Sequence, residues 1–135
     1  DKDELHRRLL CLRPGSRVNN FPGMTGLCEK VTFSRSVRHL ATFWPRLNDF
    51  VPPTWVLPDE LGAVFDQLRD AGAQGCPFIV KPEYGLQGNG IFIVRTRADM
   101  EVALSAKSLS TKSYICQRYV SHPLTLDGFK FDLRI

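Results

Sequence analysis

The sequence predicts a mixed α/β fold, with helices and strands alternating along a chain of 135 residues. Apolar residues recur at helical spacing in three segments, and four other segments are short runs rich in β-branched and aromatic residues. The helical segments begin near residues 3, 32 and 58, and the β-prone runs are residues 54–57, 77–81, 91–95 and 113–120. The content of 43% hydrophobic and 24% charged residues fits one globular domain with a modest core and argues against disorder.

The first helix is expected over residues 3–13, where Leu5, Leu9 and Leu12 follow helical spacing and "PGS" ends the segment. A turn-rich segment, "VNNFPGMTG", comes next. The arginines of this region are interpreted as a solvated face rather than a docking patch for an acidic partner; they are Arg7, Arg8, Arg13 and Arg17.

Thr32 is expected to cap a second helix, whose inward stripe would be Phe33, Val37, Leu40 and Ala41. A loop over residues 45–53 and a short strand over residues 54–57 follow. Pro58 suits the first turn of a third helix that Gly72 ends; its apolar stripe would be Leu61, Val64, Phe65 and Leu68. Three aromatic residues of this half are expected in the core, namely Trp44, Trp55 and Phe65.

In the second half, the strands "PFIVK" and "IFIVR" flank a glycine-rich loop. Thr96 and Asp99 form the pattern of a capping box, which predicts a short helix to about Lys107. "SYICQRYV" is expected to be a further strand. "LTLDGFKFDLRI" is expected to be a hairpin, because Asp127-Gly128 is a favoured two-residue turn.

Composition excludes several classes of function. No apolar run approaches the ~18 residues of a membrane span, and no signal segment opens the chain, so we expect no membrane partner. The net charge of +4 is a mild bias towards acidic partners, but no dense basic run with aromatics indicates nucleic acid. The histidines lie far apart. The cysteines are widely spaced, which favours buried free thiols in a reducing compartment over disulfides or zinc; they are Cys11, Cys28, Cys76 and Cys116.

Residues 79–94, "IVKPEYGLQGNGIFIV", place Lys81 at a strand end just before three glycines. Glycines let backbone N–H groups approach an anion, and a lysine supplies a point charge for the same phosphates. The alternative is a mobile hairpin with a solvated lysine. The phosphate-loop motif G-x-x-x-x-G-K-[ST] is absent, the spacing here is G-x-x-G-x-G, and the kinase order of loop before lysine is reversed.

A lysine followed by a glycine loop between antiparallel strands is the arrangement of ATP-grasp ligases, in which two sheets clamp the nucleotide. Four blocks then resemble, in order, the tubulin-tyrosine-ligase-like family: "VNNFPGM", "FVPPTWVLPDE", "FIVKPEYGLQGNGIFIV" and "ICQRYVSHPLTLDGFKFDLRI". A further segment, "LCEKVTFSR", matches around Lys30, and "KFDLR" is the most distinctive part. The resemblance runs from about residue 18 to the end and implies an ATP-grasp-like fold.

The resemblance implies an ATP site. Lys81 matches the family lysine that touches the phosphates, Gln87 and Gly88 match the glycine-loop contact, and Lys30 matches a lysine near the nucleotide. The segment that passes the adenine, with backbone groups reading its edge, is matched by Gln117, Arg118, Tyr119 and Val120. The segment that holds phosphate and ribose is matched by Lys130, Phe131 and Asp132, with Arg134 as a further candidate.

Alternation agrees with this hypothesis from the residues alone. Lys130, Asp132 and Arg134 would share one strand face, opposite an apolar face of Phe131, Leu133 and Ile135. A row of charges is a suitable wall for a polyphosphate, but any half-exposed strand has the same pattern.

The chain also departs from the family pattern. It has Glu29-Lys30-Val31 where an Arg-Lys pair and then Asp are common, and Glu83 and Leu86 where Asp and Cys are common in the loop. The family's magnesium ligands, an Asp and a Glu-x-Asn, lie downstream of "KFDLR", so metal ligands are expected outside this chain. From its start at Asp1 and its stop at Ile135, we expect a piece of a larger protein, truncated before the metal-binding half and inactive alone.

The resulting hypothesis is the N-terminal and central part of an ATP- and Mg²⁺-dependent tubulin amino-acid ligase. Residues 1–57 would be an N-terminal segment and residues 58–135 an incomplete central ATP-grasp subdomain. A carboxylate would become an acyl-phosphate that an amine attacks. Polyglutamylation is the first choice, with glutamate and tubulin as partners and cytoplasmic microtubules or a cilium as the location. The alternatives are a pseudoenzyme that binds tubulin or nucleotide, and an ATP-grasp ligase acting on a small molecule.

Overall fold

The structure, a computed structural model, describes residues 2–17, 24–71, 76–85, 88–106 and 113–131. Its helices are α1 (Lys2–Leu10), α2 (Lys30–Ala41), α3 (Leu61–Ala71) and α4 (Arg97–Ala106), with short 3-10 helices at Met24–Cys28 and Pro45–Asp49. Its strands are β1 (Thr54–Leu57), β2 (Phe78–Pro82), β3 (Phe92–Val94), β4 (Tyr114–Arg118), β5 (Thr125–Leu126) and β6 (Phe129–Lys130). None of these helices has the length and apolar character needed to cross a bilayer.

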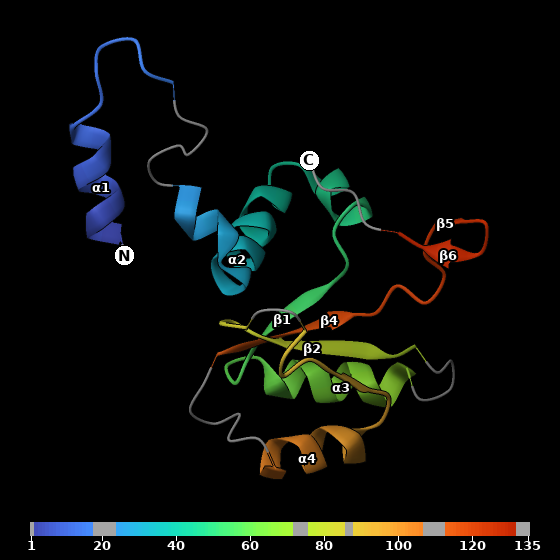
Figure 1. Ribbon diagram of the computed structural model, residues 1–135. Coiled ribbons are helices and arrows are strands. Elements are labelled where there is room, and N and C mark those ends of the chain that lie inside the picture. The colour runs from blue at the N-terminus through green and yellow to red at the C-terminus, as the bar shows by residue number, and fades with distance from the viewer. Residues whose placement is uncertain (1, 18–23, 72–75, 86–87, 107–112, 132–135) are drawn as a thin grey trace.

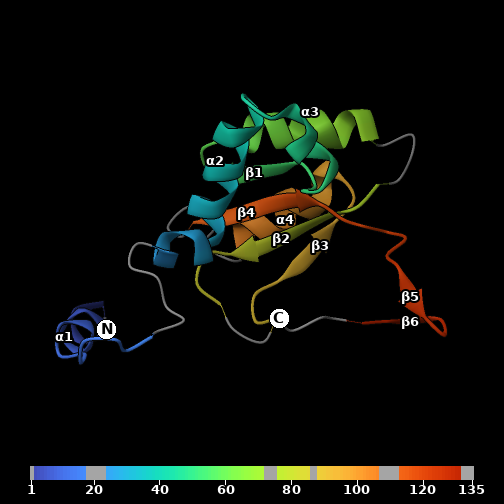
Figure 2. The same ribbon diagram turned by 90° about the horizontal axis from the view of Figure 1, so that it is seen from above.

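Four strands form one antiparallel sheet in the order β1-β4-β2-β3. The sheet lies between helix α2 on one side and helices α3 and α4 on the other (Figure 1). The β5–β6 hairpin is a separate pair that projects from the end of the sheet, and α1 stands apart from it (Figure 2). Mixed helix and antiparallel sheet confirm the expected fold class.

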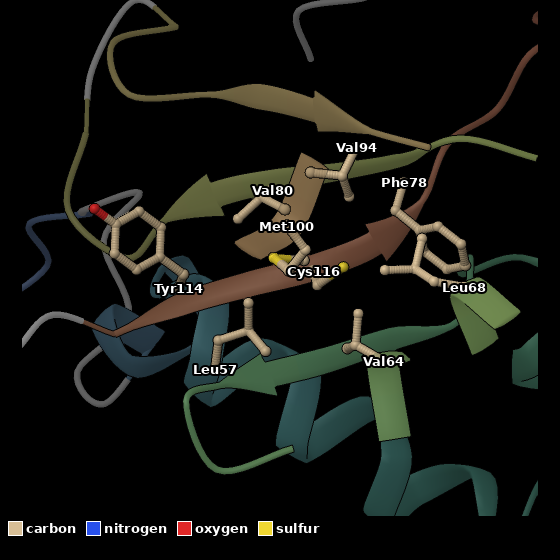
Figure 3. Packing of buried hydrophobic residues seen from close by; sticks show 9 residues of the cluster. All are labelled: Leu57, Val64, Leu68, Phe78, Val80, Val94, Met100, Tyr114 and Cys116. Atoms are coloured by element: carbon tan, nitrogen blue, oxygen red, sulfur yellow. The ribbon is translucent and has the colours of Figure 1, made fainter. Parts of the chain in front are cut away.

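Because side chains alternate along each strand, the two faces of the sheet pack against different helices. Buried side chains of β2 and β4, among them Phe78, Val80 and Cys116, point towards α3 and α4 and meet Val64 and Met100 from those helices (Figure 3). The residues between them in sequence point to the opposite face, towards α2. The register aligns Thr54 with Gln117 and Gln117 with Ile79, and aligns Lys81 with Ile115, so these residues share the α2 face.

Local signals in the sequence located most elements correctly. In the capping box, the Thr96 N–H donates to Asp99 Oδ2 at 2.9 Å and the Asp99 N–H donates to Thr96 Oγ1 at 3.1 Å. The hairpin turn has Asp127 at φ 50° and Gly128 at φ 84°, the left-handed pair that a two-residue turn requires. The strand expected through residue 135 ends at Lys130 in the structure, and Phe131 follows it outside the strand. Residues 132–135 lie outside the described residues, as do Gly72 and Lys107.

The second helix begins earlier than expected, at Lys30, with Glu29 rather than Thr32 at its N-cap. The Thr32 hydroxyl donates to the Glu29 carboxylate instead. The expected inward stripe is also wrong in part, because Phe33 and Leu40 are each 44% exposed while Ser34 is the buried residue of this helix. The buried position of this helix is therefore a polar residue, which a search for an apolar stripe does not identify.

Other expectations need correction as well. The first helix ends at Leu10 rather than residue 13, and α3 begins at Leu61, so Pro58 precedes it. Trp44 is 68% exposed and not in the core, whereas Trp55 and Phe65 do pack against the core. All four cysteines are free, but Cys116 is the buried one; Cys11, Cys28 and Cys76 are exposed. Because β1 pairs with β4, residues 54–57 belong to the central sheet; the boundary after residue 57 stays a prediction.

Candidate anion-binding site

A pocket of about 270 Å³ lies between α2 and the sheet. Its lining residues come from α2, the sheet and the segment before β1; they are Lys30, Phe33, Ser34, Val51, Thr54, Lys81, Ile115 and Gln117. A neighbouring pocket of about 410 Å³ shares Ser34, Val51 and Thr54, but its charged side chains, Arg38 and Glu60, bind each other. The smaller pocket, which contains two ammonium groups, is therefore the better candidate for binding an anion.

Lys81 is half-buried on β2 and points into this pocket. Burial, and then repulsion from Lys30 and Lys130, lowers its pKa from the usual value of 10.5. Within the described part of the chain no carboxylate offsets these effects. Three ammonium groups from α2, β2 and β6 thus create a positive field that an anionic ligand would relieve.

The ammonium of Lys81 donates to the side-chain oxygen of Gln117, with Nζ and Oε1 3.0 Å apart. Gln117 Nε2 donates to the Thr54 hydroxyl at 2.8 Å, and that hydroxyl donates to the Pro52 carbonyl oxygen at 2.8 Å. Lys81 is thereby held by a neutral acceptor, which does not neutralise its charge. No local pattern singles out Thr54, because its contact with Gln117 depends on the pairing of β1 with β4.

Lys30, the first residue of α2, donates from Nζ to the backbone oxygen of Glu83 at 3.0 Å. The buried Glu83 carboxylate accepts the Val31 N–H at 2.7 Å. A carboxylate on an N-terminal N–H satisfies a helix donor and complements the helix dipole. Glu83 therefore ties α2 to the start of the glycine loop. From the sequence, Glu83 was identified only as a departure from a family pattern. Its position two residues after Lys81 could have marked it as a residue of the site.

The glycine loop is tightly packed at Gly85 and open at Gly88. A Cβ on Gly85 would lie 3.0 Å from Pro82 Cγ and 3.1 Å from the Asn89 oxygen, so the loop packs tightly there. Gly88 has φ 79° and no heavy atom within 4 Å of an added Cβ. The space on the Cβ side of Gly88 is therefore open, as a close approach of a phosphate would require. Gln87 lies outside the described residues.

The remaining predicted residues lie around the end of β4 and the hairpin. The Arg118 N–H donates to the Pro53 oxygen and the Tyr119 N–H to the Pro77 oxygen, each at 2.9 Å, so these two donors are already engaged. Val120 and Lys130 are exposed and Phe131 is half-buried, whereas Asp132 and Arg134 lie outside the described residues. The structure therefore gathers Lys30, Lys81 and Gln117 in one pocket, with Lys130 near enough to repel Lys81.

Comparison with known proteins agrees with the resemblance seen in the sequence. The sequence model of the tubulin-tyrosine ligase family matches residues 8–135. The human protein named tubulin polyglutamylase TTLL11 is 37% identical over 123 residues, 88% of this chain and 17% of the relative. Human tubulin polyglutamylase TTLL6 is 35% identical over 128 residues, 95% of this chain and 13% of the relative. A Tetrahymena thermophila protein named probable beta-tubulin polyglutamylase is 35% identical over 124 residues, 92% and 10% of the two chains.

The chain thus spans less than a fifth of the length of these relatives. The match nevertheless covers nearly all of the chain itself and supports the ATP-grasp-like fold class. The chain belongs to the tubulin-tyrosine ligase family.

Proposed function

We propose that this chain supplies the ATP phosphate-binding part of a tubulin amino-acid ligase. The observation that carries the proposal is the convergence of Lys30, Lys81 and Lys130, whose mutual repulsion and burial disfavour the charged state of Lys81. A polyphosphate would neutralise all three ammonium groups and is the ligand class that such a field favours.

Different residues of the described part would contact different parts of the nucleotide. Lys81 would contact the phosphates from the sheet, Lys30 from the start of α2, and the open backbone at Gly88 would cover them. Because the N–H groups of Arg118 and Tyr119 are engaged, the adenine edge would be read by Val120 and by backbone oxygens of this segment. Lys130 and Phe131 would reach the phosphate and ribose from the hairpin.

Magnesium would supply further neutralisation of the phosphates. Among the described residues, no three His, Cys, Asp or Glu side chains lie close enough to hold a metal ion. The expectation that its ligands lie outside this chain stays a prediction.

The names of the relatives extend the proposal to substrate and location. Because several are named tubulin polyglutamylases, we assign glutamate as the added amino acid and tubulin as the acceptor. The reaction would join them through an acyl-phosphate at the expense of ATP. Microtubules, including those of cilia, would be the site of action.

Nucleotide affinity tests the proposal directly. Titration calorimetry with a non-hydrolysable ATP analogue should show binding that Lys81→Ala weakens at least about tenfold, because a half-buried charge contact is lost. Arg7→Ala is the matched control, since it removes one cation from α1, which lies apart from the sheet (Figure 1). Equal affinity of Lys81→Ala and the control would refute the site.

Ligation needs its own assay. The polypeptide as it occurs in its source cell should add glutamate to tubulin in the presence of ATP and Mg²⁺, and Lys81→Ala should abolish this. Nucleotide binding without any ligation would instead support a binding module that catalyses nothing.

A further inference from the structure

Lys81, Gln117, Thr54 and Pro52 form a chain of hydrogen bonds whose direction has a physical cause. The Pro52 carbonyl can only accept, so the Thr54 hydroxyl, 2.8 Å away, must donate to it. The hydroxyl then offers a lone pair to Gln117. That lone pair takes the Nε2 end of the amide, at 2.8 Å.

This arrangement determines which end of the Gln117 amide meets Lys81. With Nε2 on Thr54, the carbonyl oxygen Oε1 is left for the Lys81 ammonium, 3.0 Å away. A flipped amide would place an NH₂ group against an ammonium, donor against donor, in a half-buried pocket. Without an acceptor on β1, only the Lys81 ammonium would favour this orientation, and the Nε2 group would lose the partner that holds the amide in place.

We propose that Thr54 is a positioning residue for Lys81, holding the Gln117 amide so that its oxygen supports the lysine that binds phosphate. The inference deepens the proposed function and rests on it for the role of Lys81 as a phosphate ligand. The orientation of Gln117 does not depend on that role, because it follows from the contacts with Thr54 and the Lys81 ammonium whether or not a phosphate binds.

The need for such support comes from the surroundings of Lys81. Among the described residues, the charged groups that act on it are Lys30 from α2 and Lys130 from β6, both repulsive. Gln117 on β4 is its hydrogen-bond acceptor, and a hydrogen bond to the charged form favours that form. Loss of the acceptor would leave a half-buried ammonium with two like charges, which promotes its deprotonation.

The test replaces Thr54 by valine, which keeps the shape and removes the hydroxyl. The matched control is Thr42→Val, because the Thr42 hydroxyl also donates to a backbone oxygen, that of His39 at 2.7 Å, at the far end of α2. Thr54→Ser restores a hydroxyl. The first readout is the pKa of Lys81, measured from the NMR titration of its ¹³Cε resonance in protein labelled at lysine. The resonance that disappears in Lys81→Arg identifies Lys81.

In Thr54→Val the pKa of Lys81 should fall by about 0.5–1 pH unit relative to wild type, while Thr54→Ser and Thr42→Val should leave it within error. The affinity for a non-hydrolysable ATP analogue at pH 8 should fall about 3- to 10-fold in Thr54→Val and recover in Thr54→Ser. A Lys81 pKa that is the same in wild type and Thr54→Val, or a Thr54→Ser variant as impaired as Thr54→Val, would overturn the proposal.

The two readouts separate this inference from the proposed function. If wild type does not bind the ATP analogue but the pKa of Lys81 responds to Thr54 as expected, the positioning role holds and the assignment of ATP fails. If the analogue binds and the pKa does not respond, the assignment of ATP stands and the positioning role is refuted.

Discussion

Replacing Glu83 by alanine should destabilise the protein by breaking the contact between the glycine loop and α2. The carboxylate is buried and accepts the Val31 N–H at 2.7 Å, 52 residues away in sequence. A hydrogen bond to a charged group contributes about 1.5–3 kcal/mol, and loss of a helix N-terminal cap costs about 0.5–2 kcal/mol. These are two measures of the same contact, so we expect a loss of about 2 kcal/mol.

The assay is urea denaturation followed by far-ultraviolet circular dichroism, with the free energy of unfolding extrapolated to water. Glu83→Gln should lose about half as much as Glu83→Ala, because the amide oxygen can accept the N–H without the charge. Glu101→Ala is the control, since Glu101 forms an exposed ion pair with Arg97 at 2.8 Å and such pairs contribute less than about 1 kcal/mol.

A loss below about 0.5 kcal/mol for Glu83→Ala would refute the reasoning, because it would mean that water replaces the carboxylate at no cost. A loss in Glu83→Gln equal to that of Glu83→Ala would show that charge, rather than acceptance of the N–H, carries the effect.

Three further predictions concern other parts of the fold. Glu60 has a lowered pKa because of its hydrogen bonds with Arg38, so its stabilising effect is present near pH 7 and is lost as the pH falls through the folded-state pKa. Glu60→Gln should therefore lower the free energy of unfolding by about 1 kcal/mol at pH 7 and leave it unchanged once Glu60 is protonated in acid. Urea denaturation at both pH values measures this difference. Burial raises the pKa of Cys116 to about 12, so a thiol reagent at pH 8 should modify three cysteines in the native protein, namely Cys11, Cys28 and Cys76. Modification of Cys116 as fast as the others would contradict its burial. Gly85→Ala should destabilise by about 1 kcal/mol or more, because its Cβ would lie 3.0 Å from the Pro82 ring; unchanged urea stability would show that the loop can shift.

The sequence by itself determined the elements whose causes are local. The Thr96–Asp99 capping box and the Asp127-Gly128 turn each depend on residues a few positions apart, and both occur as expected. Alternation along β2 also places Lys81 on the face opposite the buried Phe78 and Val80, as the geometry of a strand requires. Family resemblance added the assignment of Lys30 and Lys81, which the structure brings to one pocket.

Tertiary structure decided how those residues are supported, because the supports join segments far apart in the chain. Thr54 reaches Gln117 across 63 positions and Glu83 reaches Val31 across 52, through strand register and helix docking that no local pattern encodes. The same limit explains Trp44, which is apolar enough for a core but is 68% exposed in the folded chain. Local periodicity determines which face of an element is apolar, whereas only packing between elements determines what each face meets.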